Sequence, residues 1–463
     1  MLRRRALWTA AGIASAAVLL AGPQLAPAMA GPSSPAAAQL SIYSVPGASD
    51  ATAQRLIRGG FDVLEKRAGD NLFVLGDAAT AAKLRADGFS PTLSEIVKPA
   101  NWKAPTSRLT AAAAKTATLA DPVDETYFGG YHTVKAQVAH LDKVATAFPG
   151  LARVVDYGDS WLKSRNAATG YDLKAICLTH KTADYDCKLY TGAPKPRFLL
   201  MTQIHAREIV TGDISWRFID YLTQNYGKIQ AVTDLLNTTE VWIVPVTNPD
   251  GVDVVQQGGN NPYLQRKNVD GGTSCPLPPG ASGQRGVDLN RNTSNHFGGV
   301  GTSSSLCSEV YRGASGNSEP EIAQLQTLFK QIWADQRGPN DTDAAPVTAR
   351  GTMLSLHSYA GVVLYPWGWD NKDTANGASL AKIGGHVGQL TGYDAGQPGE
   401  VLYNASGNIE DWTYGELGVA SFTVEMDSCN SFTPSYSCAG GQFTKLLPSL
   451  MYLGQQAKAP YKP

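Results

Sequence analysis

Residues 197–208 read RFLLMTQIHARE, an apolar run that ends in a histidine, an arginine and a glutamate. An apolar run without alternation predicts a strand that is buried on both faces, as in the parallel or mixed sheets of α/β proteins. His205 and Glu208 are three residues apart, so one turn of chain could present both side chains to a single ion. A His-x-x-Glu pair also recurs by chance, and charged residues are common where a strand reaches the surface. Partners elsewhere in the chain decide between these interpretations.

Three further apolar runs end in the same way. They are EVWIVPVT at 240–247, GTMLSL at 351–356 and ASFTV at 420–424. Asn248, His357 and Glu425 follow them directly. Open α/β sheets place their ligand sites at the carboxyl ends of the strands. We therefore expect one large sheet between helices, with these polar side chains gathered at one edge.

Two segments between the apolar runs have helical periodicity. Residues 134–148 place apolar side chains on one face, and the segment stops at Pro149-Gly150. The segment from Ser318 to Gln336 has Ser318 and Glu321 in the register of a capping box, with a proline between them. The sequence predicts a helix in both places.

Length and composition exclude some classes of function. The chain has 463 residues, of which 43% are hydrophobic and 17% charged, which is enough for more than one domain. Its formal net charge is −1, and no run of basic residues occurs after Arg3, Arg4 and Arg5. Because nucleic-acid binding needs a basic surface, we expect no nucleic-acid partner.

The first thirty residues have the pattern of a secretory signal peptide. The basic MLRRR precedes a short apolar segment, and the stretch ends in Ala28-Met29-Ala30, small residues at the cleavage spacing. The apolar segment is shorter than the ~20 residues that span a bilayer. We expect cleavage after residue 30 and a secreted, extracellular protein without a membrane anchor.

The six cysteines agree with an oxidising destination. In chain order they form the neighbours Cys177 and Cys187, Cys275 and Cys307, and Cys429 and Cys438. We expect local disulfides between these neighbours, although six cysteines allow fifteen connectivities. No C-x-x-C motif points to a cysteine metal site.

The chain divides into segments of different character. Residues 31–98 contain a strand, helix, strand, strand, helix, strand pattern, the order of a split β-α-β unit, without a histidine or cysteine. We interpret them as a small α+β pro-domain. Residues 99–120 are rich in Ala, Pro, Thr and Lys and predict an exposed linker with processing sites at Lys103, Arg108 and Lys115. Residues 121–463 form the predicted catalytic domain.

The strand ends supply a set of residues that suits a metal hydrolase. Two histidines and one glutamate are a ligand set for a catalytic zinc that leaves a fourth position for water. His205, Glu208 and His357 fit that set, and Glu425 is a spare carboxylate that could take a proton from the water. Each residue alone has an ordinary structural explanation. The set as a whole favours a site, because all its members lie at predicted strand ends or in the loops after them.

The motifs of this chain resemble those of the zinc metallocarboxypeptidases, the carboxypeptidase A/B family. The resemblance rests on HAREIV, NPDG, RKN, GVDLNRN, YRG with NSEPE, LHSYAGVVLYPWGW, YNASGNIEDW and SFTVEM, which occur in this order over about residues 121–455. It implies an α/β fold with a mixed eight-stranded sheet between helices. It also agrees with a signal peptide and a pro-domain before the catalytic domain.

The resemblance implies a catalytic role for several residues. His205, Glu208 and His357 would bind one Zn²⁺ ion per chain. Glu425 would act as general base and acid, and Arg266 would stabilise the oxyanion.

Further matched residues would support the metal or hold the substrate. Asp288 would orient a ligand imidazole. A larger set would contact the substrate: Asn290, Arg291 and Tyr403 at its C-terminal carboxylate, Arg207 and Tyr359 further from the cut bond, and Glu410 at the floor of the side-chain pocket. The floor of the A-type pocket is apolar and that of the B-type carries an aspartate, so Glu410 fits neither type. The Gly- and Pro-rich insertion at 268–285 also departs from the family pattern.

These expectations combine into one hypothesis about function. The protein would be a secreted, monomeric zinc carboxypeptidase that removes apolar and basic residues from the C-termini of peptides and proteins. Another protease would activate it by cutting off the pro-domain. Two alternatives stay open: an amide hydrolase of the same fold that acts on cell-wall peptides, and a catalytically inactive binding domain. The complete catalytic set argues against the second alternative.

Overall fold

The computed structural model describes residues 39–98, 124–182, 186–271, 275 and 283–462. The predicted signal peptide at 1–30 and the predicted linker at 99–120 lie outside the described residues.

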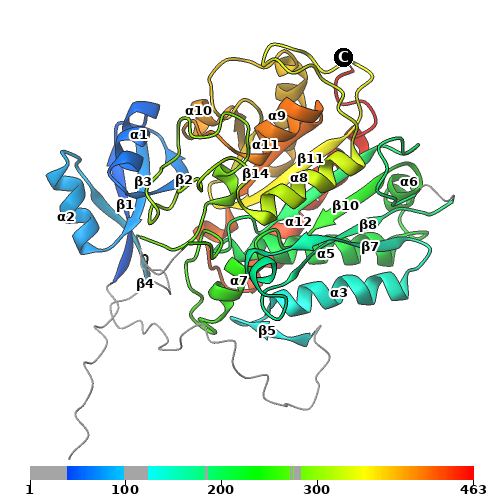
Figure 1. The fold of residues 1–463 in the computed structure, drawn as a ribbon, viewed down its shortest axis with the longest axis horizontal. Coiled ribbons are helices and arrows are strands. Elements are labelled where there is room, and N and C mark those ends of the chain that lie inside the picture. Colours follow the sequence, from blue (N-terminus) through cyan, green and yellow to red (C-terminus); the bar gives the residue numbers. More distant parts are fainter. Residues whose placement is uncertain (1–38, 99–123, 183–185, 272–274, 276–282, 463) are drawn as a thin grey trace, which may run out of the picture. The chain divides into compact units, whose positions relative to one another are not determined.

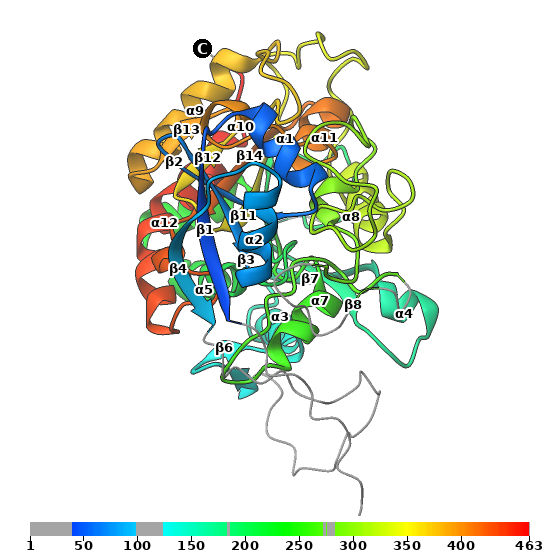
Figure 2. The same ribbon diagram turned by 90° about the vertical axis from the view of Figure 1, so that its left-hand side faces the viewer.

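The N-terminal unit is a four-stranded antiparallel sheet with two helices. Its elements in chain order are β1 (Leu40–Pro46), α1 (Asp50–Arg58), β2 (Asp62–Ala68), β3 (Asn71–Gly76), α2 (Ala78–Ala86) and β4 (Thr92–Lys98). The strands pair in the order β2-β3-β1-β4, and Figure 2 shows them in blue. Ser49 and Asp77 cap the two helices by accepting hydrogen bonds from Thr52 and Thr80. This element order is the one predicted from the sequence.

The larger unit follows from residue 124. Its strands are β5 (Thr126–Tyr127), β6 (Tyr131–His132), β7 (Ala152–Asp159), β8 (Asp172–Leu178), β9 (Arg197–Thr202), β10 (Glu240–Val244), β11 (Thr352–Ser358), β12 (Val362–Leu364), β13 (Asp394–Gly396) and β14 (Ala420–Met426). Its α-helices are α3 (Val134–Ala147), α4 (Trp161–Arg165), α5 (Ile209–Asn225), α6 (Gln230–Thr238), α7 (Pro249–Gln256), α8 (Pro320–Ile332), α9 (Gly377–Thr391), α10 (Pro398–Val401), α11 (Ile409–Leu417) and α12 (Ser437–Gln456). The 3-10 turns η2 (Leu289–Arg291) and η3 (Ser428–Asn430) also belong to it.

Eight of these strands form one mixed sheet, which confirms the predicted fold class. The strand order is β13-β12-β14-β11-β9-β10-β8-β7. The four central strands β14, β11, β9 and β10 are parallel to one another, and their outer neighbours β12 and β8 run antiparallel to them. The four apolar runs identified in the sequence are these central strands. Their carboxyl ends therefore meet at one edge of the sheet.

Helices cover both faces of the sheet, as Figure 1 shows. One face packs against α3, α5, α6, α9 and α12, with fully buried residues such as Phe218 and Leu450. The other face packs against α8 and α11 through Phe329 and Trp412. The central strands are thus buried on both sides, which explains why their sequences do not alternate.

Two local predictions have different outcomes. The three disulfides join the neighbours expected from the sequence, Cys177–Cys187, Cys275–Cys307 and Cys429–Cys438. The predicted capping box at the start of α8 is wrong. Glu319 is the N-cap and makes no capping hydrogen bond, and the Ser318 hydroxyl donates to the Glu319 carboxylate instead. Among the described residues, no helix has the length and apolar character needed to cross a membrane.

Candidate active site

Three buried side chains at the carboxyl edge of the sheet converge on one point. His205 and Glu208 lie between the end of β9 and the start of α5, and His357 lies near the end of β11. The Nδ1 atom of His205 lies 2.8 Å from Glu208 Oε1, and the Nδ1 atom of His357 lies 3.2 Å from Glu208 Oε2. The three ligand atoms lie within 4.8 Å of one another, so these residues could hold a metal ion.

The outer nitrogens of both histidines have partners of their own. His205 Nε2 lies 3.1 Å from Asp288 Oδ1, and His357 Nε2 lies 2.9 Å from the Ser355 hydroxyl. Partners on Nε2 fix the ring orientation and direct Nδ1 toward the shared point. The donor set of two imidazole nitrogens and one carboxylate therefore fits zinc with an open position.

The electrostatics of the site keep its supporting carboxylate ionised. Burial alone would raise the pKa of Asp288, but Arg266, Arg291 and His205 hold it well below the usual range. Burial and Arg266 oppose protonation of His205, yet Glu208 and Asp288 leave its pKa raised. A bound cation would replace that proton, because metal binding requires a neutral imidazole.

Glu425 lies at the end of β14, next to the candidate metal ligands. Its Oε1 atom is 3.8 Å from His357 Nδ1, and its Oε2 atom has no hydrogen-bond partner within the described residues. Burial, together with the charges of Glu208 and Glu65, raises the pKa of Glu425 well above its usual value. The structure therefore places an available carboxyl group beside the position where a metal would bind.

A cluster of cations close to the candidate ligands binds a carboxylate from the N-terminal unit. Arg266 donates from Nη1 and Nη2 to the two oxygens of Glu65, at 2.9 and 2.6 Å. Arg291 Nη2 reaches the same carboxylate at 3.4 Å, and the Tyr403 hydroxyl lies 3.5 Å from it. Burial opposes ionisation of Glu65, but Arg266 and the other nearby cations lower its pKa to about 2. We call Arg266, Arg291 and Tyr403 the cation clamp.

A second carboxylate of β2 neutralises Arg207. Asp62 accepts two hydrogen bonds from this guanidinium, at 2.8 and 3.2 Å. Both residues are at most 1% exposed. Tyr359 packs edge-on against Phe432, and the Arg207 guanidinium lies over the same Phe432 ring. The residues predicted to contact substrate away from the cut bond are thus covered in part by the N-terminal unit.

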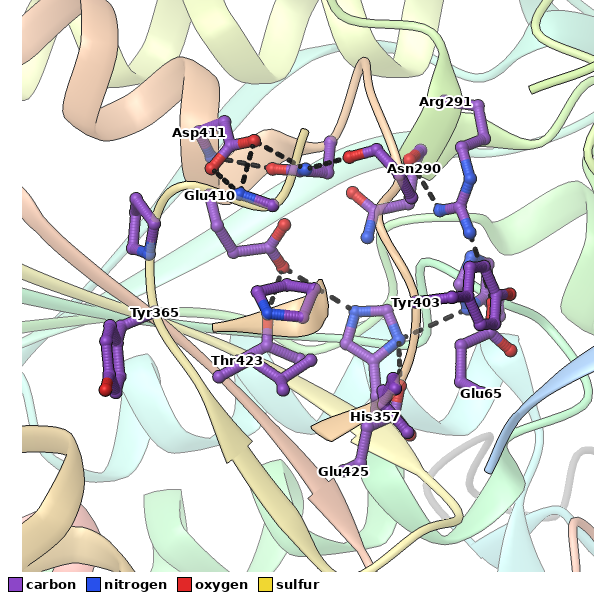
Figure 3. A pocket seen from close by; sticks show the side chains of 18 residues that line it. Glu65, Asn290, Arg291, His357, Tyr365, Tyr403, Glu410, Asp411, Thr423 and Glu425 are labelled. Carbon is purple, nitrogen blue, oxygen red and sulfur yellow. Dashed lines mark hydrogen bonds and ion pairs between the residues drawn. The ribbon is translucent and has the colours of Figure 1, made fainter. Parts of the chain in front are cut away.

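A cleft extends from His205 and His357 past Arg291 and Tyr403 to a side-chain pocket. Glu410 lines this pocket from the first turn of α11, together with apolar atoms of Leu364 and Ala405. Glu410 Oε1 accepts a hydrogen bond of 2.5 Å from the Thr423 hydroxyl, as drawn in Figure 3. Asn290, predicted to hold the substrate carboxylate, also lines the cleft.

Sequence reasoning missed several residues of the site. It assigned no role to Asp62 and Glu65, because nothing local in the segment FDVLEKRAG shows what the strand will touch. It also missed Ser355 and Thr423, which resemble ordinary residues of buried strands. Their positions two residues before His357 and Glu425 were a usable signal, because residues i and i+2 share one face of a strand.

The comparisons with known proteins agree with this geometry. Residues 137–440 match the sequence profile described as zinc carboxypeptidase. Carboxypeptidase A2 of Mus musculus is 31% identical over 306 residues, which cover 65% of this chain and 63% of that protein. Carboxypeptidase A1 of Homo sapiens is 29% identical over 308 residues, with the same coverage of 65% and 63%. This chain belongs to the zinc carboxypeptidase family. The alignments span 63% of the length of these relatives.

Solved structures show the same fold. The carboxypeptidase A from Helicoverpa armigera superposes with a TM-score of 0.67 at 23% identity, covering 91% of this chain and 98% of that one. The thrombin-activatable fibrinolysis inhibitor superposes with a TM-score of 0.65 at 19% identity, covering 90% and 99%. At these identities the likeness is one of fold.

Proposed function

We propose that this protein is a secreted zinc carboxypeptidase that removes single residues from the free C-termini of peptides and proteins. The observation that carries the proposal is the convergence of His205, Glu208 and His357 beside Glu425 and the cation clamp, in a chain that belongs to the zinc carboxypeptidase family. When bound, zinc would supply Lewis-acid polarisation of the scissile carbonyl and would acidify a water molecule.

The chain's own residues would perform the proton transfers and hold the charge. Glu425 would accept a proton from the attacking water and return it to the leaving amine, because its carboxyl lies next to the metal position, where a bound cation and the departure of Glu65 would favour its ionised form. The Arg266 guanidinium would donate to the oxygen that becomes negative in the transition state.

The cation clamp supports recognition of a free C-terminus. Its Arg266 and Arg291 already hold a carboxylate, that of Glu65. A substrate's terminal carboxylate presents the same group and would take Arg291 and Tyr403 once Glu65 has left, which would free Arg266 for the oxyanion. Asn290 lines the cleft beside Arg291 and would add an amide donor. C-terminal amides and internal peptide bonds would then be poor substrates.

We further infer that residues 31–98 form a pro-domain that keeps the enzyme inactive. Asp62 and Glu65 of β2 neutralise Arg207 and Arg266. Apolar residues of the same unit share one buried cluster with Leu402, Tyr403 and Ala405 of the cleft. Peptide entry requires that these contacts break. An activating protease would cut within residues 99–120.

The side-chain pocket supports broad specificity. Glu410 offers a negative charge to a C-terminal Lys or Arg, while Leu364 and Ala405 offer apolar contact to other side chains. A buried charge pair is offset in part by the desolvation of both ions, so the preference for basic residues would be moderate. C-terminal Asp and Glu would be rejected by like charge.

Secretion agrees with the sequence pattern of the first thirty residues and with three disulfides in the described chain. We expect a monomer in solution.

A product assay tests the proposed function. Peptides that differ in their last residue are incubated with the linker-cleaved protein, and the released amino acids are measured with and without a zinc chelator. We expect release of one residue at a time from peptide acids, no release from the matched C-terminal amides, and loss of activity with chelator. Internal cleavage, or activity that survives metal removal, would contradict the proposal.

A further inference from the structure

The side-chain pocket contains two neighbouring acids with different surroundings. Asp411 accepts hydrogen bonds from the Gly368 amide at 2.9 Å and from the Asn408 side chain at 2.9 Å. Burial raises the pKa of Asp411 to about 7. Its carboxyl group is therefore committed to the protein, and it is not available to a substrate cation.

Glu410 is held by one side-chain donor. In the part of the chain that the structure describes, Thr423 alone donates a side-chain hydrogen bond to this carboxylate, and it donates to Oε1. Figure 3 shows the two side chains pointing toward each other. Glu410 is 7% exposed and lines the cleft. Its Oε2 atom is not the one that accepts from Thr423.

The nearby metal ligand does not compete strongly for Glu410. His357 Nε2 lies 3.9 Å from Glu410 Oε1, which is too long for a hydrogen bond. The same nitrogen lies 2.9 Å from the Ser355 hydroxyl. Ser355 therefore satisfies the histidine, and the charge of Glu410 remains available to the pocket.

Thr423 can act on Glu410 because of its place in β14. Thr423 and Glu425 are two residues apart in the strand and point to the same face. Ser421, a further two residues back, donates from its hydroxyl to the Glu410 backbone carbonyl at 2.7 Å. The strand that carries the candidate general base thus also fixes both the backbone and the side chain of Glu410.

We propose that Thr423 is a positioning residue for substrate selection. Its hydroxyl binds one oxygen of Glu410 and leaves the other oxygen facing the C-terminal side chain of the substrate. As a result, a C-terminal lysine is preferred to a C-terminal arginine. An ammonium group is satisfied by one carboxylate oxygen, whereas a guanidinium binds best in a fork to both oxygens. The Thr423 hydroxyl takes one of the two acceptor sites of Oε1, so an arginine fork would have to share that oxygen with it. This inference rests on the proposed carboxypeptidase function and names the substrate class of its pocket.

The test compares Thr423→Val with Thr423→Ser in the full-length protein after cleavage of the linker. Valine keeps the shape of threonine and removes the donor, whereas serine keeps the donor. kcat and KM are measured on peptides that are identical except for a C-terminal Lys, Arg or Leu. Zinc content and Tm of both variants show whether the fold and metal site are intact.

In Thr423→Val we expect kcat/KM for the Lys peptide, divided by kcat/KM for the Leu peptide, to fall about tenfold, because a hydrogen bond to a charged group is lost. Most of this change should appear in KM. The ratio of Lys to Arg should fall about threefold, because a freed carboxylate can form the fork with arginine. Thr423→Ser should keep both ratios near those of the wild type.

Equal losses for Lys, Arg and Leu would overturn the inference, because a purely structural defect has that signature. An unchanged ratio of Lys to Arg would overturn it as well. If the wild-type protein released no residue from any of the three peptides, the proposed function itself would be wrong. The two failures are therefore distinguishable.

Discussion

The cation clamp and the side-chain pocket, the two sides of the cleft, differ in which part of the chain supplies the partners of their charged residues. In the cation clamp, Arg266 and Arg291 share the carboxylate of Glu65, which belongs to the N-terminal unit, and Arg266 also pairs with Asp288 of the larger unit. In the side-chain pocket, Glu410 is held by Thr423 of the same larger unit. Under the proposed function the clamp would have two states, one with the Glu65 carboxylate and one with a substrate carboxylate. The contacts of the side-chain pocket lie within the larger unit, so we expect the proposed removal of the N-terminal unit to leave them unchanged.

The largest expected effect concerns the metal on which both sides of the cleft depend. His357→Ala removes one of three predicted ligands, so zinc content should fall from about one per chain to near zero. Peptidase activity should be lost with it. Elemental analysis and the product assay measure both quantities. His386→Ala, a histidine of α9 that is not one of the ligands, is the control and should retain zinc and activity. Full activity without zinc would contradict the assignment.

The next effect separates chemistry from metal binding. Glu425→Gln keeps the size of the side chain but removes the proton acceptor, so kcat should fall by at least about 100-fold. Zinc content should stay near normal, because Glu425 is not one of the three ligands. Glu416→Gln, an exposed acid of α11, is the matched control. A Glu425→Gln enzyme with near-normal turnover would show that another group transfers the proton.

A smaller effect sharpens the description of the pocket. Glu410→Ala should lower the ratio of kcat/KM for basic to apolar C-terminal residues by about tenfold or more, equivalent to about 1.4 kcal/mol. The reason is the loss of the negative charge that faces the substrate side chain. Competition assays with mixed Lys and Leu peptides give the ratio directly. If the ratio did not change, Glu410 would not be the selector.

The smallest expected effect is a pH dependence of the stability of the uncleaved protein, which arises from Glu309. Burial, followed by the charge of Asp62, raises the pKa of Glu309 from 4.5 to about 8. The folded, uncleaved protein therefore holds a proton that the unfolded chain releases above its ordinary pKa. The stability that this proton provides is lost as pH rises from the ordinary value toward the raised one.

Thermal unfolding of the uncleaved chain measures this effect. The Glu309→Gln variant cannot ionise at this position. As pH rises from about 5 to about 8, the Tm of the variant should therefore increase relative to the Tm of the wild type. The Asp62→Asn substitution removes the negative charge that helps to raise the pKa of Glu309. The difference in Tm between Asp62→Asn and the double variant Asp62→Asn/Glu309→Gln should therefore depend less on pH. A constant difference in Tm across this range would refute the assignment of the proton to Glu309.

Much of the fold could be predicted because its signals are local and repeated. Four apolar runs without alternation predicted four central strands, and polar residues after each run predicted a site at their common edge. The order of elements in the N-terminal unit was equally readable. The ligand set followed from the types of residue at the strand ends, His205, Glu208 and His357.

The remainder depends on contacts between residues distant in sequence. Glu65 and Arg266 are 201 residues apart, and neither segment shows that the other will neutralise it. The capping prediction at Ser318 failed for the same reason. The Asn292 side chain, 26 residues earlier, donates to the Ser318 hydroxyl and accepts from the Glu319 amide. A tertiary contact thus replaced the local capping pattern.

The most direct test of the account is the rate of release of a C-terminal residue by the full-length protein before and after cleavage within residues 99–120. The structure places Glu65 in the cation clamp of the uncleaved chain, so we expect little release before cleavage and a clear rise in kcat/KM afterwards. The rise should be abolished by chelator and restored by zinc. An uncleaved chain that hydrolyses peptide acids as fast as the cleaved chain would contradict the account.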